Sequence, residues 1–146
     1  MVKSITEKCS AKINIAIDVL GKYPNDYHEV RMIMTQVGIF DVITISLKDE
    51  KGIEIAGSDI NMPVDESNLA WKAANEFFKA IKFDGGCDIY IEKHIPMGAG
   101  MAGGSSDAAG VINGLNKLFD SPLSLEERMK MGKKLGADVP FCVMGG

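Results

Sequence analysis

The chain has 146 residues, enough for one ordinary domain built around a single hydrophobic core. Its 16 basic and 20 acidic residues give a net charge of −4, which excludes a general attraction to nucleic acid or to an anionic membrane surface. No segment is as long and apolar as a membrane span, and the first residues lack the apolar core of a signal peptide, so we expect a cytoplasmic protein that acts on small molecules. Cys9, Cys87 and Cys142 are widely spaced in apolar surroundings, and we expect reduced core thiols.

The first third of the chain predicts a sheet. Apolar and polar residues alternate over residues 9–19, which is the period of a half-buried strand and places Lys12 and Asn14 on one face. The Pro and Asn-Asp content of residues 22–26 predicts a turn. Residues rich in β-branched side chains predict further strands at 29–37, 42–47 and 52–57.

The middle of the chain predicts two helices with a strand between them. Over residues 65–82 an apolar residue recurs every four positions, which predicts an amphipathic helix, and residues 87–92 alternate as a strand does. Apolar residues from 111 to 119 predict a second helix, for which Ser105 or Ser106 is the expected N-cap.

The last part of the chain predicts one more helix and one more strand. Ser124 and Glu127 have the spacing of a capping box, and the helix that they begin is expected to run through Leu135 and end at Gly136. The apolar run over residues 139–144 predicts a buried strand. Strands followed by strand-loop-helix units predict an α+β layer.

The stretch from Pro96 to Ala109 is a glycine-rich loop that leads into a helix. Its glycines allow the backbone to approach a ligand closely, and the helix adds unpaired N–H groups and the positive end of its dipole, so the stretch predicts a phosphate site. The spacing of Gly98, Gly100 and Gly103 also fits the dinucleotide fingerprint, but the preceding strand is not continuously apolar. The lysine of a phosphate-loop nucleotidase is missing.

Three blocks together carry a resemblance to a known family. Ala-Lys-Ile-Asn at 11–14 with Asp-Tyr-His-Glu at 26–29, the glycine loop, and Gly-Ala-Asp-Val-Pro at 136–140 resemble the GHMP kinase superfamily, and within it the kinases that act on a cytidine-diphosphate sugar alcohol. The resemblance implies an N-terminal α+β domain like domain 2 of ribosomal protein S5, here residues 1–146, without the ferredoxin-like C-terminal domain. We therefore expect a truncated chain with impaired activity. Asp26 departs from the glycine usual in this turn.

The resemblance also implies roles for individual residues, with ATP and Mg²⁺ as cofactors. Lys12 and Asp138 match the catalytic pair, Asp138 accepting or orienting the proton of the attacking hydroxyl. Asn14, Tyr27 and His28 match the substrate contacts, with Tyr27 stacking on cytosine and His28 bonding to its edge. Weaker expectations place Asn68, Leu69 and Lys93 near adenine, and the Ser106 hydroxyl on the Mg²⁺ of Mg-ATP. The expected phosphate-binding residues are Pro96, Met97, Gly98, Ala99, Gly100, Met101, Ala102, Gly103, Gly104, Ser105 and Ser106.

The function implied is ATP-dependent phosphorylation of the 2-hydroxyl of that sugar alcohol, in the non-mevalonate route to isoprenoid precursors. Two alternatives stay open: another GHMP kinase acting on a different small alcohol, and an NAD-binding domain. We expect no nucleic-acid and no membrane partner. His94 is interpreted as a surface residue.

Overall fold

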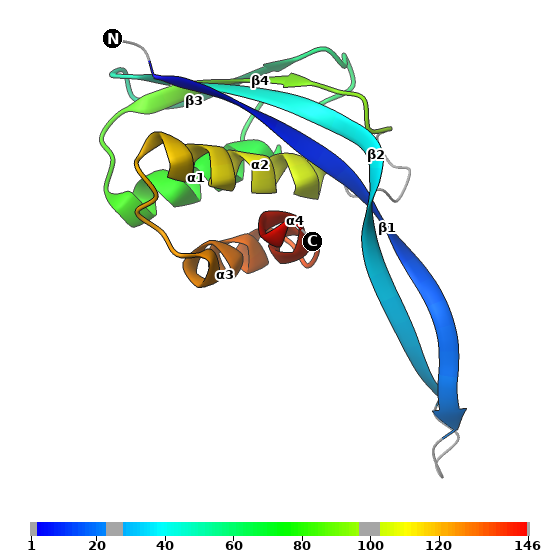
Figure 1. Cartoon of the computed structure of the whole chain (residues 1–146). Helices are drawn as coiled ribbons and strands as arrows, with labels where there is room; N and C mark the ends of the chain where they lie inside the picture. Colours follow the sequence, from blue (N-terminus) through cyan, green and yellow to red (C-terminus); the bar gives the residue numbers. More distant parts are fainter. Residues whose placement is uncertain (1–2, 23–27, 97–102, 146) are drawn as a thin grey trace.

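The computed structural model describes residues 3–22, 28–96 and 103–145, and for residues 13–22 and 28–37 it describes the backbone alone. Within this part, β1 (Ser4–Lys22), β2 (His28–Lys48), β3 (Gly52–Gly57) and β4 (Gly86–Glu92) form a single sheet in the order β1-β2-β4-β3 (Figure 1). The β1–β2 and β2–β4 pairs are antiparallel, whereas β3 and β4 are parallel. A parallel pair needs a crossover connection, and α1 (Leu69–Ile81) supplies it.

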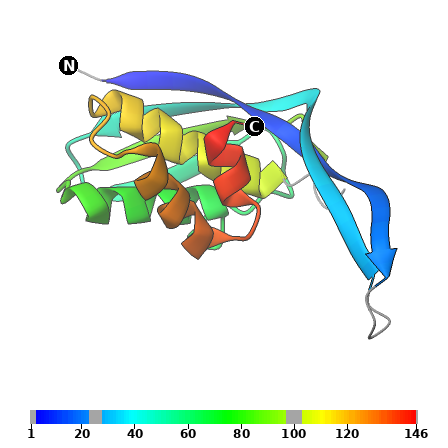
Figure 2. The ribbon, with the colours of Figure 1, turned by 60° about the horizontal axis from the view of Figure 1, so that its bottom comes forward.

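The helices lie on one face of this sheet. Figures 1 and 2 show α1 and α2 (Gly103–Leu118) against the sheet, with α3 (Leu125–Leu135) and α4 (Val139–Met144) packed on those helices from outside. The core lies between sheet and helices and is almost entirely aliphatic on the strand side, where Ile43 faces Ile91 and Ile45 faces Ile89 across β2 and β4. Helix residues complete the core: Ala70, Ala73, Ala74, Phe77, Ala108, Val111, Ile112 and Leu115.

Strands β1 and β2 are longer than the other two strands of the sheet. Their far halves leave the body as a paired two-stranded arm, which Figure 1 shows projecting away from the helices. The register of this pair shifts between Ser10 and Lys12, between Ala16 and Asp18, and between Val19 and Gly21.

Several expectations from the sequence are confirmed. The helix expected over 65–82 is α1, and the strands expected over 52–57 and 87–92 are β3 and β4. Ser124 and Glu127 form both bonds of a capping box at the start of α3. The cysteines are free, and burial raises the pKa of Cys87 to about 12 and that of Cys142 to about 11, as expected for unreactive thiols. The turn expected at 22–26 lies almost wholly outside the described residues.

Three predictions about secondary structure are wrong. The strands expected at 29–37 and 42–47 are one strand, β2, because pairing with β1 continues past Gly38 through a register shift. The strand expected at 139–144 is α4: Pro140 lies in its first turn, where a missing N–H is harmless, and Val139 and Val143 share its buried side. Ser105 and Ser106 lie inside the first turn of α2, which begins at Gly103, so neither is its N-cap.

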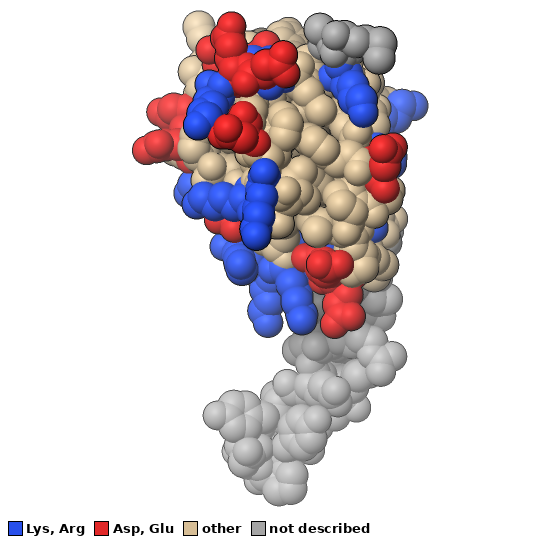
Figure 3. Space-filling view, turned by 90° about the vertical axis from the view of Figure 1, so that its left-hand side faces the viewer, with Lys and Arg blue, Asp and Glu red and all other residues tan. Residues whose placement is uncertain are grey.

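Among the described residues, the helices are too short or too polar to cross a membrane. Figure 3 shows a face on which basic and acidic side chains lie side by side, consistent with the mixed charge of the sequence.

Candidate functional site

An ion pair joins β1 to the start of α4. Lys12 Nζ lies 3.2 Å from Asp138 Oδ1, and the lysine side chain is 1% exposed whereas the aspartate side chain is 42% exposed. Asp138 occupies the N-cap position of α4 but makes no side-chain bond to that helix. The carboxylate is therefore not used as a cap, and it faces solvent above a buried ammonium.

The burial of Lys12 follows from the register of β1. Strict alternation would place Lys12 on the opposite face from Ala11, which is fully buried. The register between β1 and β2 shifts at this point, with Ser10 opposite Phe40 and Lys12 opposite Gln36, and two consecutive residues of β1 become buried. Without the family resemblance, the alternating pattern would have left Lys12 as a solvated strand residue.

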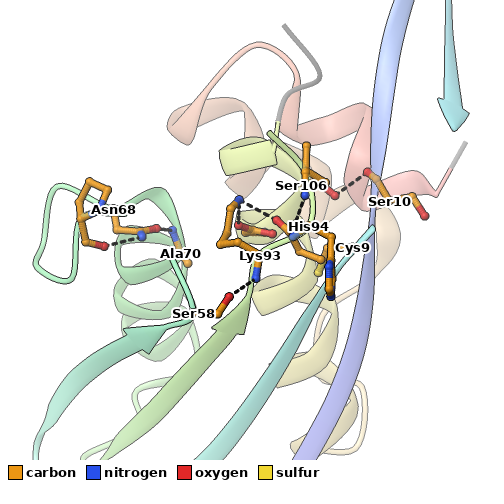
Figure 4. Close-up of polar contacts among 12 residues, drawn as sticks. Cys9, Ser10, Ser58, Asn68, Ala70, Lys93, His94 and Ser106 are labelled. Carbon is orange, nitrogen blue, oxygen red and sulfur yellow. Dashed lines mark hydrogen bonds and ion pairs between the residues drawn. The ribbon is translucent and has the colours of Figure 1, made fainter. Parts of the chain in front are cut away.

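The start of α2 lies next to this pair. The Ser106 hydroxyl donates a hydrogen bond of 2.7 Å to the carbonyl oxygen of Ser10, two residues before Lys12 (Figure 4). Gly103, Gly104 and Ser105 begin the helix, so its unpaired N–H groups and the positive end of its dipole are close to β1. Pro96 ends the described segment before the loop, and residues 97–102 of the predicted phosphate loop lie outside the described residues.

The expected Mg²⁺ contact of Ser106 stays a prediction. Its side chain is buried and its proton is directed to the Ser10 carbonyl. Within the described ranges, no group of three or more His, Cys, Asp or Glu side chains is placed to hold a metal ion. We therefore assign no metal ligand among the residues that the structure describes.

The residues expected near adenine have structural partners. Asn68 caps α1, accepting from the Ala70 N–H at 2.9 Å and donating to the Pro63 carbonyl at 2.8 Å. Lys93 binds two carboxylates, and Leu69 is partly buried against the core. The polar atoms of Asn68 and Lys93 are thus engaged within the protein, and an adenine contact by these residues stays a prediction.

The residues expected to bind the substrate lie along the arm. Asn14 is two positions beyond Lys12 in an unbroken stretch of register, so its backbone is close to the ion pair. His28 begins β2 opposite Lys22, which puts it roughly 30 Å along the strand from Lys12. The structure therefore does not bring His28 next to the Lys12–Asp138 pair. Tyr27 lies outside the described residues, and the side chains of Asn14 and His28 are not described.

A buried charged cluster beneath the start of α2 was not identified from the sequence. Lys93 Nζ lies 2.7 Å from Asp41 Oδ2 and 3.0 Å from Asp107 Oδ2, and the three side chains are 6%, 0% and 3% exposed. The available signals were an aspartate inside the apolar strand segment 39–43 and another directly before two buried alanines. Charged residues are usually exposed, so neither aspartate is recognisable from the sequence as a buried residue.

The pKa values of the two carboxyl groups in this cluster are shifted in opposite directions. Burial raises the pKa of Asp107 to about 8, and its hydrogen bond to Asp41 acts in the same direction. Burial alone would also raise the pKa of Asp41, but the hydrogen bonds from Asp107, from the Ile95 and His94 N–H groups and from Lys93 hold that pKa below its usual range. Burial opposes the charge on Lys93, but the two carboxyl groups outweigh it and raise the pKa of Lys93.

The arrangement is suited to reactions of phosphate esters. The start of a helix offers N–H donors to an anion, and a solvent-facing carboxylate above a buried ammonium can take a proton from a hydroxyl while the ammonium stabilises the developing negative charge. The fold and this site agree with one class of protein. The chain belongs to the GHMP kinases: the family model for the GHMP kinases N terminal domain matches residues 68–146.

Within the GHMP kinases, the chain is similar to individual kinases that share one name. The chain is 45% identical over 139 residues to the 4-diphosphocytidyl-2-C-methyl-D-erythritol kinase of Clostridium tetani, covering 95% of this chain and 49% of that protein. It is 48% identical over 142 residues to the kinase of the same name from Lachnoclostridium phytofermentans, covering 97% and 49%. The chain thus spans about half the length of the curated relatives it matches.

Solved structures agree in fold. A crystal structure of a 4-(cytidine 5'-diphospho)-2C-methyl-D-erythritol kinase superposes with a TM-score of 0.77 at 33% identity, covering 97% of this chain and 49% of that chain. Homoserine kinase from Cytophaga hutchinsonii superposes with a TM-score of 0.72 over 98% of this chain and 42% of that chain, but at 15% identity it shows the shared fold alone.

Proposed function

We propose that this chain forms the nucleotide-binding half of a 4-diphosphocytidyl-2-C-methyl-D-erythritol kinase. The observation that carries the proposal is the ion pair between Lys12 and Asp138, brought to the start of α2 by two segments that are far apart in the sequence. Sequence identity of 45% and 48% over nearly the whole chain supports this substrate over other alcohols.

The proposed reaction moves the γ-phosphoryl group of ATP to the 2-hydroxyl of the sugar alcohol. The hydroxyl oxygen bonds to the γ-phosphorus, the bond from that phosphorus to the β–γ bridging oxygen breaks, and ADP leaves. Asp138 accepts or orients the hydroxyl proton, and the Lys12 ammonium stabilises negative charge on the attacking oxygen. The N–H groups at the start of α2 hold phosphate oxygens, and Mg²⁺ enters as part of the substrate Mg-ATP.

The test is an ADP-release assay with Mg-ATP and 4-diphosphocytidyl-2-C-methyl-D-erythritol. It compares this chain alone with a fusion in which the C-terminal half of the Clostridium tetani relative follows Gly146. We expect turnover only in the fusion, because the curated relatives have about twice the length of this chain. Asp138→Ala should lower kcat of the fusion by roughly 10²- to 10⁴-fold, the usual range for a lost general base. The matched control Asp88→Asn changes an exposed carboxylate of β4 and should leave kcat unchanged.

The outcome separates the proposal from its alternatives. Turnover that survives Asp138→Ala would remove this residue from the reaction. Phosphorylation of homoserine or mevalonate, but not of the cytidine substrate, would show a GHMP kinase with another acceptor. The alternative of a dinucleotide-binding domain is not retained, because such a domain has a mostly parallel sheet whereas only β3 and β4 are parallel among the described strands.

The cytosine contacts of Tyr27 and His28 are tested separately. Base stacking on an aromatic ring contributes about 1–3 kcal/mol, so Tyr27→Ala should raise KM for the cytidine substrate by roughly 5- to 150-fold with little change in kcat. His28→Ala should raise KM in the same way. An unchanged KM in both variants would place the cytosine site elsewhere.

A further inference from the structure

Asp41 of β2 fixes the chain segment that enters the glycine-rich loop. One of its carboxylate oxygens accepts from the His94 N–H at 2.6 Å and from the Ile95 N–H at 2.8 Å, and the other accepts from Lys93 Nζ at 2.7 Å. Three consecutive residues before Pro96 are therefore held by a single fully buried side chain. Figure 4 shows Lys93 and His94 within this cluster of contacts.

The same cluster also reaches the helix that leaves the loop. Lys93 Nζ donates to Asp107 Oδ2 at 3.0 Å, and Asp107 lies near the start of α2. A Cβ atom added to Gly103 would come within 3.2 Å of Lys93 Nζ and 3.1 Å of Ile95 Cγ2. The two ends of the loop are thus in contact, with the ammonium of Lys93 between Asp41 and Asp107.

The donors in the cluster are unevenly distributed between the two carboxyl groups. Asp41 accepts from three N–H groups, whereas Asp107 accepts from Lys93 through Oδ2 and its Oδ1 is buried without a hydrogen-bond partner among the described residues. With both carboxyls ionised the buried cluster would carry a net negative charge, which is strongly unfavourable away from water. Asp107 is therefore the group that takes a proton.

We propose that Asp41 and Lys93 are positioning residues that lock the two ends of the phosphate loop together, and that Asp107 completes the cluster as a neutral carboxylic acid. Neutrality matters for binding, because an uncompensated anion under the first turn of α2 would weaken the positive potential that attracts phosphate. The raised pKa of Asp107, about 8, supports this arrangement. Other titratable groups that act on the cluster are Cys9 of β1 and Cys142 of α4, both thiols with raised pKa values.

The inference rests on the proposed function in one respect, namely that the loop holds ATP. Its test measures Mg-ATP binding to this chain by calorimetry at neutral pH, well below the unfolding temperature, for Asp41→Asn, Lys93→Met and Asp107→Asn. The amide of Asp41→Asn puts an N–H donor where the cluster needs an acceptor, so ATP should bind at least about tenfold more weakly, and the same holds for Lys93→Met. Asp107→Asn keeps the shape and the zero charge, and its ATP affinity should stay within about twofold of the parent chain.

The control is Asp88→Asn, the same chemical change at an exposed carboxylate paired with Lys48. An ATP affinity of Asp41→Asn equal to that of the parent would overturn the positioning role, and an Asp107→Asn chain as weak as Asp41→Asn would overturn the neutral state of Asp107. A second measurement needs neither ATP nor a variant that folds: the ¹³C carboxyl signal of Asp107 in the parent chain at neutral pH. A protonated signal supports the inference and an ionised one overturns it, whereas a parent chain that binds no ATP overturns the proposed function instead.

Discussion

The protonated state of Asp107 has a measurable effect on folding, which Asp107→Asn isolates. The pKa of this carboxyl is about 8 in the folded chain against an ordinary value of 3.8, and the side chain is 3% exposed, so solvent does not screen the effect. Between these two pH values the folded state binds a proton that the unfolded state has released. The free energy of unfolding of the parent chain therefore falls as pH rises, and it levels off above the folded pKa.

The magnitude follows from the slope of this linkage. One bound proton changes the free energy of unfolding by about 1.4 kcal/mol per pH unit, so from about pH 5 to pH 8 the parent chain should lose about 4 kcal/mol relative to Asp107→Asn. All other titratable groups are the same in both chains, so their contributions cancel in the difference to first order. Asp41, with its lowered pKa, stays ionised in both chains over this range.

The assay is urea unfolding followed by circular dichroism at intervals across this pH range. The difference between the two chains, rather than either curve alone, is the quantity to plot. Asp88→Asn serves as the control and should run parallel to the parent chain, because its carboxylate is exposed. Curves for the parent and Asp107→Asn that are also parallel would refute the reasoning, since they would mean that the buried carboxyl is already ionised at pH values near 5.

Three further predictions concern packing and capping. Gly110→Ala in α2 places a Cβ atom against the Sγ atom of the buried Cys9 and should destabilise the chain by about 1–3 kcal/mol, measured by urea unfolding. Gly86→Ala places a Cβ atom against the Gly52 carbonyl of the neighbouring strand, a backbone atom that cannot turn aside, so we expect a lower yield of folded chain and a fall in Tm. Ser124→Ala removes the cap of α3 and should cost about 1 kcal/mol in the same unfolding assay.

Matched variants separate these effects from general damage. Gly104→Ala makes the same change in the same helix, but the nearest atom among the described residues, Leu69 Cδ1, is 3.8 Å away, so stability should be unchanged or higher. Ser124→Thr keeps the capping oxygen and should retain most of the stability lost in Ser124→Ala. A stable Gly110→Ala chain would mean that the Cys9 side chain can rotate away, and an unaffected Gly86→Ala chain would mean that β3 and β4 can separate locally.

Elements with a strong period could be predicted from the sequence, whereas short apolar runs could not. The strand at 87–92 and the helix at 65–82 each bury one face. Burial of one face requires apolar residues at every second position of a strand and about every fourth position of a helix, and the sequence shows both patterns. The run at 139–144 has too few residues for a period to show, and tertiary packing of Val139 and Val143 makes it a helix. Helix α2 begins at Gly103, two residues before the first serine, so the presence of a serine alone did not locate its start.

The residues of the site also differ in how far the sequence predicts them. Lys12 and Asp138 were matched through the family resemblance, and no local pattern indicates that two residues so distant in sequence meet. The cluster of Asp41 and Asp107 cannot be predicted from the sequence, because a buried carboxylate is recognised by its partners, which only the folded chain shows. The arm was foreseen as strands, but its extent carries His28 away from the ion pair, which pattern alone does not reveal.

The register shift between Ser10 and Lys12 has a consequence for how this site can be lost. The lysine is buried because the strand changes phase immediately before it, and so the amino acid and the spacing are both needed. A one-residue deletion or insertion between Ser4 and Ser10 that is carried through the shift, rather than absorbed there, would turn the lysine to the open face of the sheet. Such a chain would still contain Lys12, Asp138 and the glycine loop in the right order. An alignment judged only by the identities of these site residues would treat the site as intact. The lysine ammonium would nevertheless point away from the Asp138 carboxylate.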